Sequence, residues 1–182
     1  IMVACGTAFL ACQTAKYWIE RLAGLPVETD IASEFRYRDA PVGDRTLAIF
    51  VSQSGETADT LAALRHVQGR ARIAAVVNVT ESSIAREADL VLPILAGREI
   101  GVASTKAFTC QLTVLALLAL KAAHDLGRLT DAALATHLDD LRHLPGLLSH
   151  ALTTADEIAR VSRRLADASD ILFLGRGQMY PI

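Results

Sequence analysis

Four apolar runs alternate with segments of helical periodicity, and this alternation most constrains what the chain can fold into. The runs lie at residues 1–5, 46–51, 73–79 and 90–92. Most of their successive positions are apolar, so the strands that they predict are buried on both faces. Such strands, alternating with helices, are typical of a parallel sheet with helices on each side. The sequence therefore predicts an α/β fold.

The segments between the apolar runs predict helices and one short extended piece. We expect helices over residues 8–22, 57–67, 82–87 and 104–123. Gly24 is the expected C-terminal stop of the first helix. An extended piece is expected at 27–30, and the pattern over 32–38 is ambiguous.

The C-terminal part predicts two more helices. Leu134, Leu138 and Leu141 indicate one helix, which Pro145-Gly146 should break. A further helix is expected over residues 147–165.

Residues 170–177 form another apolar run that ends in small residues, as residues 1–6 do. This similarity predicts two copies of one α/β unit. We expect a first domain over 1–145, followed over 146–182 by a linker helix and the first strand of a truncated second domain.

The predicted helix over 104–123 is apolar nearly all round between Leu112 and Leu120. It should therefore be buried from several sides or lie in a subunit interface, which predicts a homodimer. The apolar run itself is too short to span a bilayer, so no membrane partner is expected.

Composition narrows the function further. The 182 residues are 52% hydrophobic with a net charge of −2, which indicates a globular protein and no nucleic-acid partner. Three cysteines and five histidines show no ligand or redox spacing, so we expect no metal and a reduced, cytoplasmic setting. No glycine fingerprint follows the first strand, so no dinucleotide cofactor is expected.

The segment Ser52-Gln53-Ser54-Gly55-Glu56-Thr57 joins a predicted strand to the start of a helix. Backbone N–H groups, the helix dipole and three hydroxyls would form a phosphate seat that needs no metal and no lysine. The alternative is that Ser54 or Thr57 is an ordinary helix N-cap, worth about 1 kcal/mol. Glu56 is expected to point to solvent.

The segment 52–57 resembles the phosphate loop of sugar isomerase (SIS) domains. Four further segments narrow the resemblance, namely 4–7, 32–38, 99–109, and 174–177 with Tyr180-Pro181. In this order the five segments resemble the isomerase half of the glutamine–fructose-6-phosphate aminotransferase family, from end to end of the chain.

The resemblance implies a three-layer α/β/α domain around a five-stranded parallel sheet. It implies an enzyme that converts fructose 6-phosphate, with ammonia released from glutamine, to glucosamine 6-phosphate. The chain would be the first of two SIS domains, with a glutaminase domain and the second SIS domain as its partners in the same protein. The family's catalytic glutamate, histidine and lysine lie beyond the matched segments, so no catalytic residue is expected here.

The resemblance also implies the residues that contact the phosphosugar. They are Cys5, Gly6, Thr7, Ser52, Gln53, Ser54, Thr57, Val102, Ala103 and Ser104. Cys5 could instead be a small buried hydrophobe, Gly6 a simple turn residue and Ser104 a cap of the long helix. Lys106 is expected at the surface rather than as a nucleophile, and Ala8 stands where many members carry serine.

Two other functions are compatible with the same phosphate loop. One is another phosphosugar isomerase or a deaminase without a glutaminase domain. The other is a phosphosugar-sensing regulator of transcription.

Overall fold

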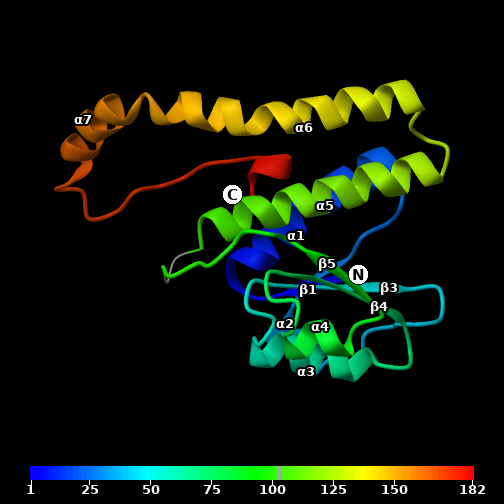
Figure 1. Cartoon of the computed structure of the whole chain (residues 1–182). Helices are drawn as coiled ribbons and strands as arrows, with labels where there is room; N and C mark the ends of the chain where they lie inside the picture. The colour runs from blue at the N-terminus through cyan, green and yellow to red at the C-terminus, as the bar shows by residue number, and fades with distance from the viewer. Residues whose placement is uncertain (102–103) are drawn as a thin grey trace.

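A five-stranded parallel sheet forms the centre of the computed structural model, which describes residues 1–101 and 104–182 (Figure 1). The strands are β1 (Met2–Ala4), β2 (Thr29–Ile31), β3 (Leu47–Ser52), β4 (Arg72–Val77) and β5 (Leu90–Pro93). They lie in the order β2-β1-β3-β4-β5, and every neighbouring pair is parallel. The five positions after the first in both β3 and β4 are buried, as expected of strands covered on both faces.

Helices cover both faces of the sheet (Figure 1). They are α1 (Gly6–Trp18) with the π-helical turn η1 (Ile19–Ala23), α2 (Ala32–Phe35), α3 (Ala58–Val67), α4 (Ser83–Glu87), α5 (Lys106–Asp125), α6 (Asp131–Leu152), α7 (Ala155–Leu165) and the 3-10 turn η2 (Gly177–Met179). Helices α1 and α5 lie on one face, and α2, α3 and α4 on the other. The predicted three-layer α/β/α architecture is confirmed.

Alternate residues of each strand enter two separate cores, because successive strand side chains point to opposite faces. Met2 and Val51 pack with α1 and α5, whereas Val3 and Phe50 pack with α2 and α3. The face of α1 toward the first core carries small side chains, Ala8, Ala11, Cys12 and Ala15. Small side chains let α5 pack closely beside α1.

The first helix stops where the sequence predicts. Gly24 takes the left-handed conformation, with φ of 67°, directly after η1. The ambiguous segment that follows contains the short helix α2, whose Phe35 is fully buried.

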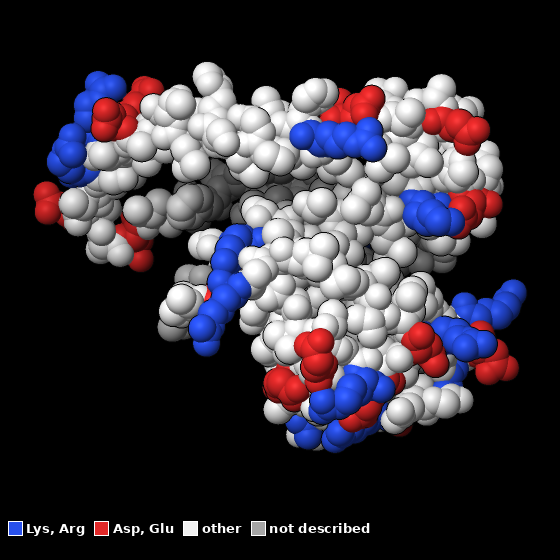
Figure 2. All heavy atoms as spheres, viewed as in Figure 1, with Lys and Arg blue, Asp and Glu red and all other residues white. Residues whose placement is uncertain are grey.

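Helix α5 is less enclosed than expected. Ala107, Leu115, Ala119 and Ala123 face the core, whereas Leu117 is 40% exposed. Helices α1 and η1 and strand β4 pack against α5, and α6 runs alongside it (Figure 1), so α5 is covered from more than one side but not all round. Figure 2 shows that charged side chains on this face lie over α3, α4, α6 and α7 and at the two ends of α5, whereas few lie along the middle of α5.

The length and composition of α5 would suffice for a membrane span. Its buried stripe nevertheless packs against α1 and the sheet, as in the covering helix of an α/β layer.

The predicted helix break at Pro145-Gly146 is wrong. Helix α6 continues through Pro145 and ends at Leu152. A proline removes one N–H donor, but no residue of α6 is buried, so water can hydrogen-bond to the carbonyl left without a partner. The break comes instead at Thr153 and Thr154, whose hydroxyls donate to carbonyls of the preceding turn, at 2.7 Å in both cases.

The predicted strand over 170–177 is not formed among the described residues. Leu172, Phe173 and Leu174 are 82%, 85% and 86% exposed. A strand needs a neighbour for its backbone hydrogen bonds, and this segment lies away from the sheet (Figure 1).

Candidate functional site at the carboxyl edge of the sheet

The strand order places a topological switch point at the carboxyl ends of β1 and β3. These two strands are adjacent, with Ala4 paired to Val51. The chain leaves β1 toward β2 on one side and leaves β3 toward β4 on the other. In open α/β sheets, ligands bind at such a switch point, outside the carboxyl ends of the strands. The structure therefore brings together the residues predicted after each strand, 5–7 and 52–57.

Hydrogen bonds shape the loop after β3. Ser52 Oγ accepts from the Gly55 backbone N–H at 3.0 Å and lies 3.0 Å from Thr57 Oγ1. Ser54 Oγ accepts from the Glu56 backbone N–H at 3.1 Å. Thr57 occupies the N-cap position of α3, but within the described residues its side chain does not cap the helix. The interpretation of Ser54 or Thr57 as an ordinary N-cap is therefore wrong.

The hydroxyl hydrogens leave this loop able to donate. Ser52 and Thr57 carry one hydroxyl hydrogen each, and the bond between them uses one of the two. The other hydrogen is free to bind an acceptor. The Ser54 hydroxyl hydrogen is free as well, because Ser54 Oγ acts as the acceptor in its contact with the Glu56 N–H. The first backbone N–H groups of α3 have no helical partner, so the loop offers backbone donors beside its hydroxyl donors.

Gly55 gives this loop its turn. Its φ is +66°, a conformation that residues with a side chain rarely adopt. A Cβ at this position would lie 1.9 Å from Ser82 Oγ, so the space is also closed. The Gly55 carbonyl accepts from the Ile84 N–H at 3.1 Å, which ties the loop to α4.

The expectation that Glu56 simply points to solvent is incomplete. Its Oε1 accepts from the Ser83 backbone N–H at 2.7 Å, at the start of α4. Hydrogen bonds from Ser83 hold the pKa of Glu56 below its usual value. The carboxylate thus ties the loop after β3 to the start of α4.

The loop after β1 lies open beside the seat. Gly6 has a φ of +57°, and a Cβ there would meet no described atom within 4 Å. Thr7 is exposed and Cys5 is half-buried. The fully buried cysteine is Cys12, where burial raises the pKa of the thiol to about 12. Cys5 is only partly buried, and it packs against the core that contains Val3 and Phe50, which agrees in part with the alternative of a small buried hydrophobe.

The third predicted segment is described only in part, because Val102 and Ala103 lie outside the described residues. Glu99 Oε1 accepts from the N–H groups of Thr105 and Ala107, at 3.1 and 3.3 Å. Glu99 therefore caps α5, and the expected alternative of a Ser104 cap is wrong. The buried Ser104 hydroxyl has no hydrogen-bond partner among the described residues.

Lys106 is exposed, as expected, and its ammonium donates to the Arg98 carbonyl. Together with the Glu99 cap, this contact ties both ends of the segment 98–106 to each other.

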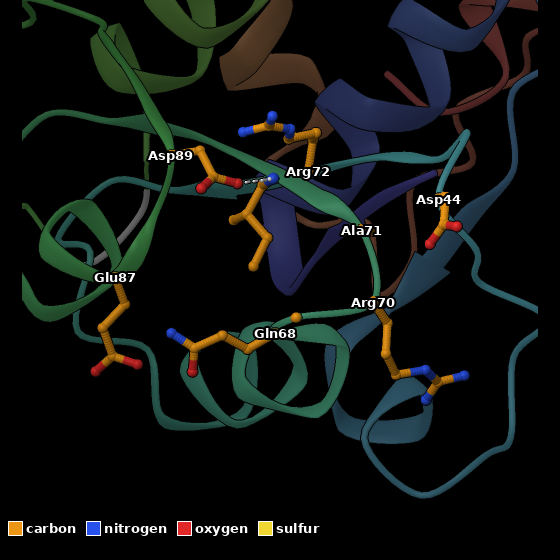
Figure 3. A pocket seen from close by; sticks show the side chains of 9 residues that line it. Asp44, Gln68, Arg70, Ala71, Arg72, Glu87 and Asp89 are labelled. Carbon is orange, nitrogen blue, oxygen red and sulfur yellow. Dashed lines mark hydrogen bonds between the residues drawn. The ribbon is translucent and has the colours of Figure 1, made fainter.

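A pocket of about 360 Å³ lies at the opposite, amino edge of the sheet. Figure 3 shows Glu87 on one side of it and Asp44 and Arg70 on the other. Its charges are mixed, and two acidic groups are already bound: Glu87 to Arg65, and Asp89 to the Ile73 N–H at 2.7 Å. None of the predicted site residues lines this pocket.

Sequence reasoning missed the residues that support these loops, Glu56, Ser82 and Glu99. Ser82 caps α4 by accepting from the Ala85 N–H at 3.4 Å, and the local pattern of a serine before a short helix could have indicated that role. The contacts of Glu56 and Glu99 depend on how the loops fold back, which no local pattern shows.

A doubly wound parallel sheet with a switch point between β1 and β3 defines an open α/β domain, a class in which ligands bind outside the carboxyl ends of the strands. The chain belongs to the SIS domain family, which matches residues 1–121.

Two relatives have the same name, glutamine–fructose-6-phosphate aminotransferase (isomerizing). The relative from Bradyrhizobium diazoefficiens is 56% identical over 182 residues, and that from Zymomonas mobilis 55% identical over 185. Each match covers 100% of this chain and 30% of the relative. The chain thus spans about a third of the length of these curated relatives.

Solved structures agree in fold. The C-terminal domain of glucosamine-fructose-6-phosphate aminotransferase from Francisella tularensis matches 99% of this chain and 51% of its own, with a TM-score of 0.96 and 46% identity. Glucosamine-6-phosphate deaminase from Thermotoga maritima matches 68% of this chain and 39% of its own, with a TM-score of 0.62 and 30% identity.

Proposed function

We propose that the carboxyl edge of this domain binds the 6-phosphate of a phosphosugar. The domain would be part of an enzyme that converts fructose 6-phosphate and glutamine-derived ammonia to glucosamine 6-phosphate. The observation that carries the proposal is the loop after β3, where hydroxyls of Ser52, Ser54 and Thr57 gather at the N-terminus of α3. The relatives' names supply the reaction.

The proposed seat suits a phosphate because it offers donors without a fixed positive charge. Backbone N–H groups and hydroxyls can each meet one phosphate oxygen, and the helix dipole favours the anion. The Glu56 carboxylate accepts from the Ser83 N–H at the start of α4, so it does not take up the loop hydroxyls proposed for the phosphate. The residues 5–7 and 102–104 would then contact the sugar.

A phosphate anchor far from the reacting carbons contributes binding energy that positions the other end of the sugar. By the family resemblance, the acid, base and Schiff-base residues belong to a second SIS domain. We therefore propose that residues 1–145 are a first SIS domain, that 146–182 lead into a second, and that this chain alone does not turn over fructose 6-phosphate.

The proposal extends to partners and setting. A glutaminase domain and a second SIS domain in one protein would account for the greater length of the relatives. We propose a cytoplasmic homodimer with no nucleic-acid or membrane partner, supported by the net charge of −2 and the weakly charged surface along α5 (Figure 2). The deaminase alternative is less well supported, because that likeness has lower identity and coverage.

Titration of the chain with fructose 6-phosphate, glucosamine 6-phosphate and unphosphorylated fructose tests the proposed seat. We expect the two phosphosugars to shift the amide NMR signals of residues 52–60 and fructose to leave them unchanged. Ser54→Ala should weaken phosphosugar binding about tenfold, the value of one hydrogen bond to a charged group.

Ser149→Ala is the matched control, because Ser149 lies on α6 and donates to the Pro145 carbonyl at 2.8 Å. Its phosphosugar affinity should equal that of the unchanged chain. Equal affinity for fructose and fructose 6-phosphate, or an unaltered affinity in Ser54→Ala, would contradict the phosphate seat.

A further inference from the structure

Asn78 lies between the two loops that the proposed function assigns to the phosphate and to the sugar. It directly follows β4, the neighbour of β3, at the carboxyl edge of the sheet. Its backbone N–H donates to the Gln53 carbonyl at 3.1 Å. Its side chain reaches the opposite way, where Nδ2 donates to the Gly97 carbonyl at 2.7 Å and Oδ1 accepts from the Ala96 N–H at 2.9 Å.

The amide side chain suits this position for a chemical reason. It carries a donor and an acceptor at its tip, so it can bind an N–H and a C=O of neighbouring residues at once. An aspartate would lack the donor for Gly97, and a leucine of similar shape would lack both groups. The backbone around 96–97 has no regular secondary structure, so these two bonds take the place of a strand partner.

The held segment continues toward the predicted sugar contacts. Two residues beyond Gly97, Glu99 caps α5 through Thr105 and Ala107. Ser104, with its buried hydroxyl, directly precedes this cap. Hydrogen bonds therefore run from the phosphate loop at Gln53, through Asn78, to the segment that leads into α5.

We propose that Asn78 is a positioning residue that sets the placement of residues 96–101, and through Glu99 that of the start of α5, relative to the phosphate loop. The inference rests on the proposed function, since it concerns how one phosphosugar meets both loops. The side chain of Asn78 acts on the sugar-contacting segment, while its backbone N–H acts on the phosphate loop. Removing the side chain should therefore impair recognition of the sugar and spare recognition of the phosphate.

Amide NMR titrations of the chain with fructose 6-phosphate and with inorganic phosphate separate these two effects. In Asn78→Ala we expect affinity for fructose 6-phosphate to fall about tenfold, since two hydrogen bonds that hold the segment are lost. Affinity for inorganic phosphate should change less than about twofold, because the Gln53 contact uses the backbone. The Ala96 amide should also exchange its hydrogen faster.

Thr80→Ala is the matched control. Thr80 lies two residues further along, is exposed, and its hydroxyl donates to Glu81 at 2.8 Å. This variant should bind both ligands as the unchanged chain does. If Asn78→Ala does not fold, Asn78→Ser replaces it, because serine keeps a polar group but is too short to bridge both backbone groups.

Three results would overturn the positioning role. The first is an unchanged ratio of the two affinities in a folded Asn78 variant, whether both fall together or neither does. The second is failure of both variants to fold, which would make Asn78 a residue of stability alone. The third is no binding of either ligand to the unchanged chain, and only this result would contradict the phosphate seat as well.

Discussion

Two cysteines, one at the end of β1 and one within α1, differ in what surrounds their sulfur atoms. Cys12 is fully buried on the inner face of α1, and burial raises the pKa of its thiol to about 12. Cys5 is half-buried at the end of β1, beside the proposed seat. Because the thiolate is the reactive form, position alone should separate their chemistry.

Alkylation with iodoacetamide at pH 8 should therefore modify Cys5 and leave Cys12 unmodified in the folded chain. Fructose 6-phosphate should slow the modification of Cys5 by covering it, whereas Cys110 on α5 is the internal control and should react at the same rate with and without ligand. Peptide mass spectrometry measures all three rates. Modification of Cys12 at the rate of Cys5 would contradict the described packing, and a Cys5 rate indifferent to the ligand would argue against its place in the site.

Gly55 has both a positive φ and no space for a Cβ, whereas Gly69 has only the positive φ. A comparison of the two glycines therefore measures the two effects separately. Both have positive φ, +66° and +77°, but only at Gly55 would a Cβ meet another atom, Ser82 Oγ at 1.9 Å. Gly69→Ala should lower the free energy of unfolding by about 1 kcal/mol, the strain of the left-handed conformation. Gly55→Ala adds the clash and should lower it by about 3 kcal/mol. Urea unfolding measures both, and equal losses would show that the Ser82 contact is not confining.

Helix α4 depends on a carboxylate from a distant loop, which makes its stability sensitive to pH. Ser83 hydrogen bonds lower the pKa of Glu56, so the folded state favours the ionised carboxylate. The stabilisation is present above the ordinary glutamate pKa, and it is lost as pH falls through the lowered pKa of the folded state. Glu56 thus helps to hold both α4 and the loop after β3.

Glu56→Gln should remove this pH-dependent part. The unchanged chain should be more stable than the variant at pH 7, and the difference should shrink as the pH falls below about 4. Urea unfolding at a series of pH values measures the difference. Two stability curves that stay parallel down to acid pH would show that the Ser83 contact contributes nothing in solution.

The sheet and its covering helices could be predicted because their signals are local. Apolar runs such as 46–51 and 73–79 predict buried strands from their own composition, and Gly24 indicates a helix end. The path of α6 through Pro145 could not be predicted, since it depends on the helix lying at the surface. The Asn78 and Glu99 contacts join loops that only the folded chain brings together.

The same distinction applies to the candidate site. Serines and glycine after β3 are a local signal of a seat at a helix start, and the family resemblance pointed to the same residues. Which hydroxyl donates and which accepts follows only from contacts such as that between Ser52 and Thr57. The hydrogen bond from Ser83 to Glu56 could not be predicted, because the two residues lie in different segments of the chain.

The molecule as a whole is well packed around the sheet, whereas its C-terminal part is largely exposed to solvent. Helices α6 and α7 have no buried residue, and Leu172, Phe173 and Leu174 are more than 80% exposed. Exposed apolar groups in such number are typical of a surface that another unit covers. The run 170–177 resembles residues 1–6, which contain β1, a strand that has a neighbour on each side in this domain.

We therefore expect residues 170–177 to become a buried strand in a longer polypeptide that has the full length of the relatives. Hydrogen exchange followed by mass spectrometry compares the two polypeptides directly. In this chain the backbone of 170–176 should exchange within seconds, because it has no strand partner, and in the longer one it should be protected. Residues 47–52 of β3 are the control and should be protected in both. Rapid exchange of 170–176 in both polypeptides would contradict the second α/β unit and the proposed domain boundary with it.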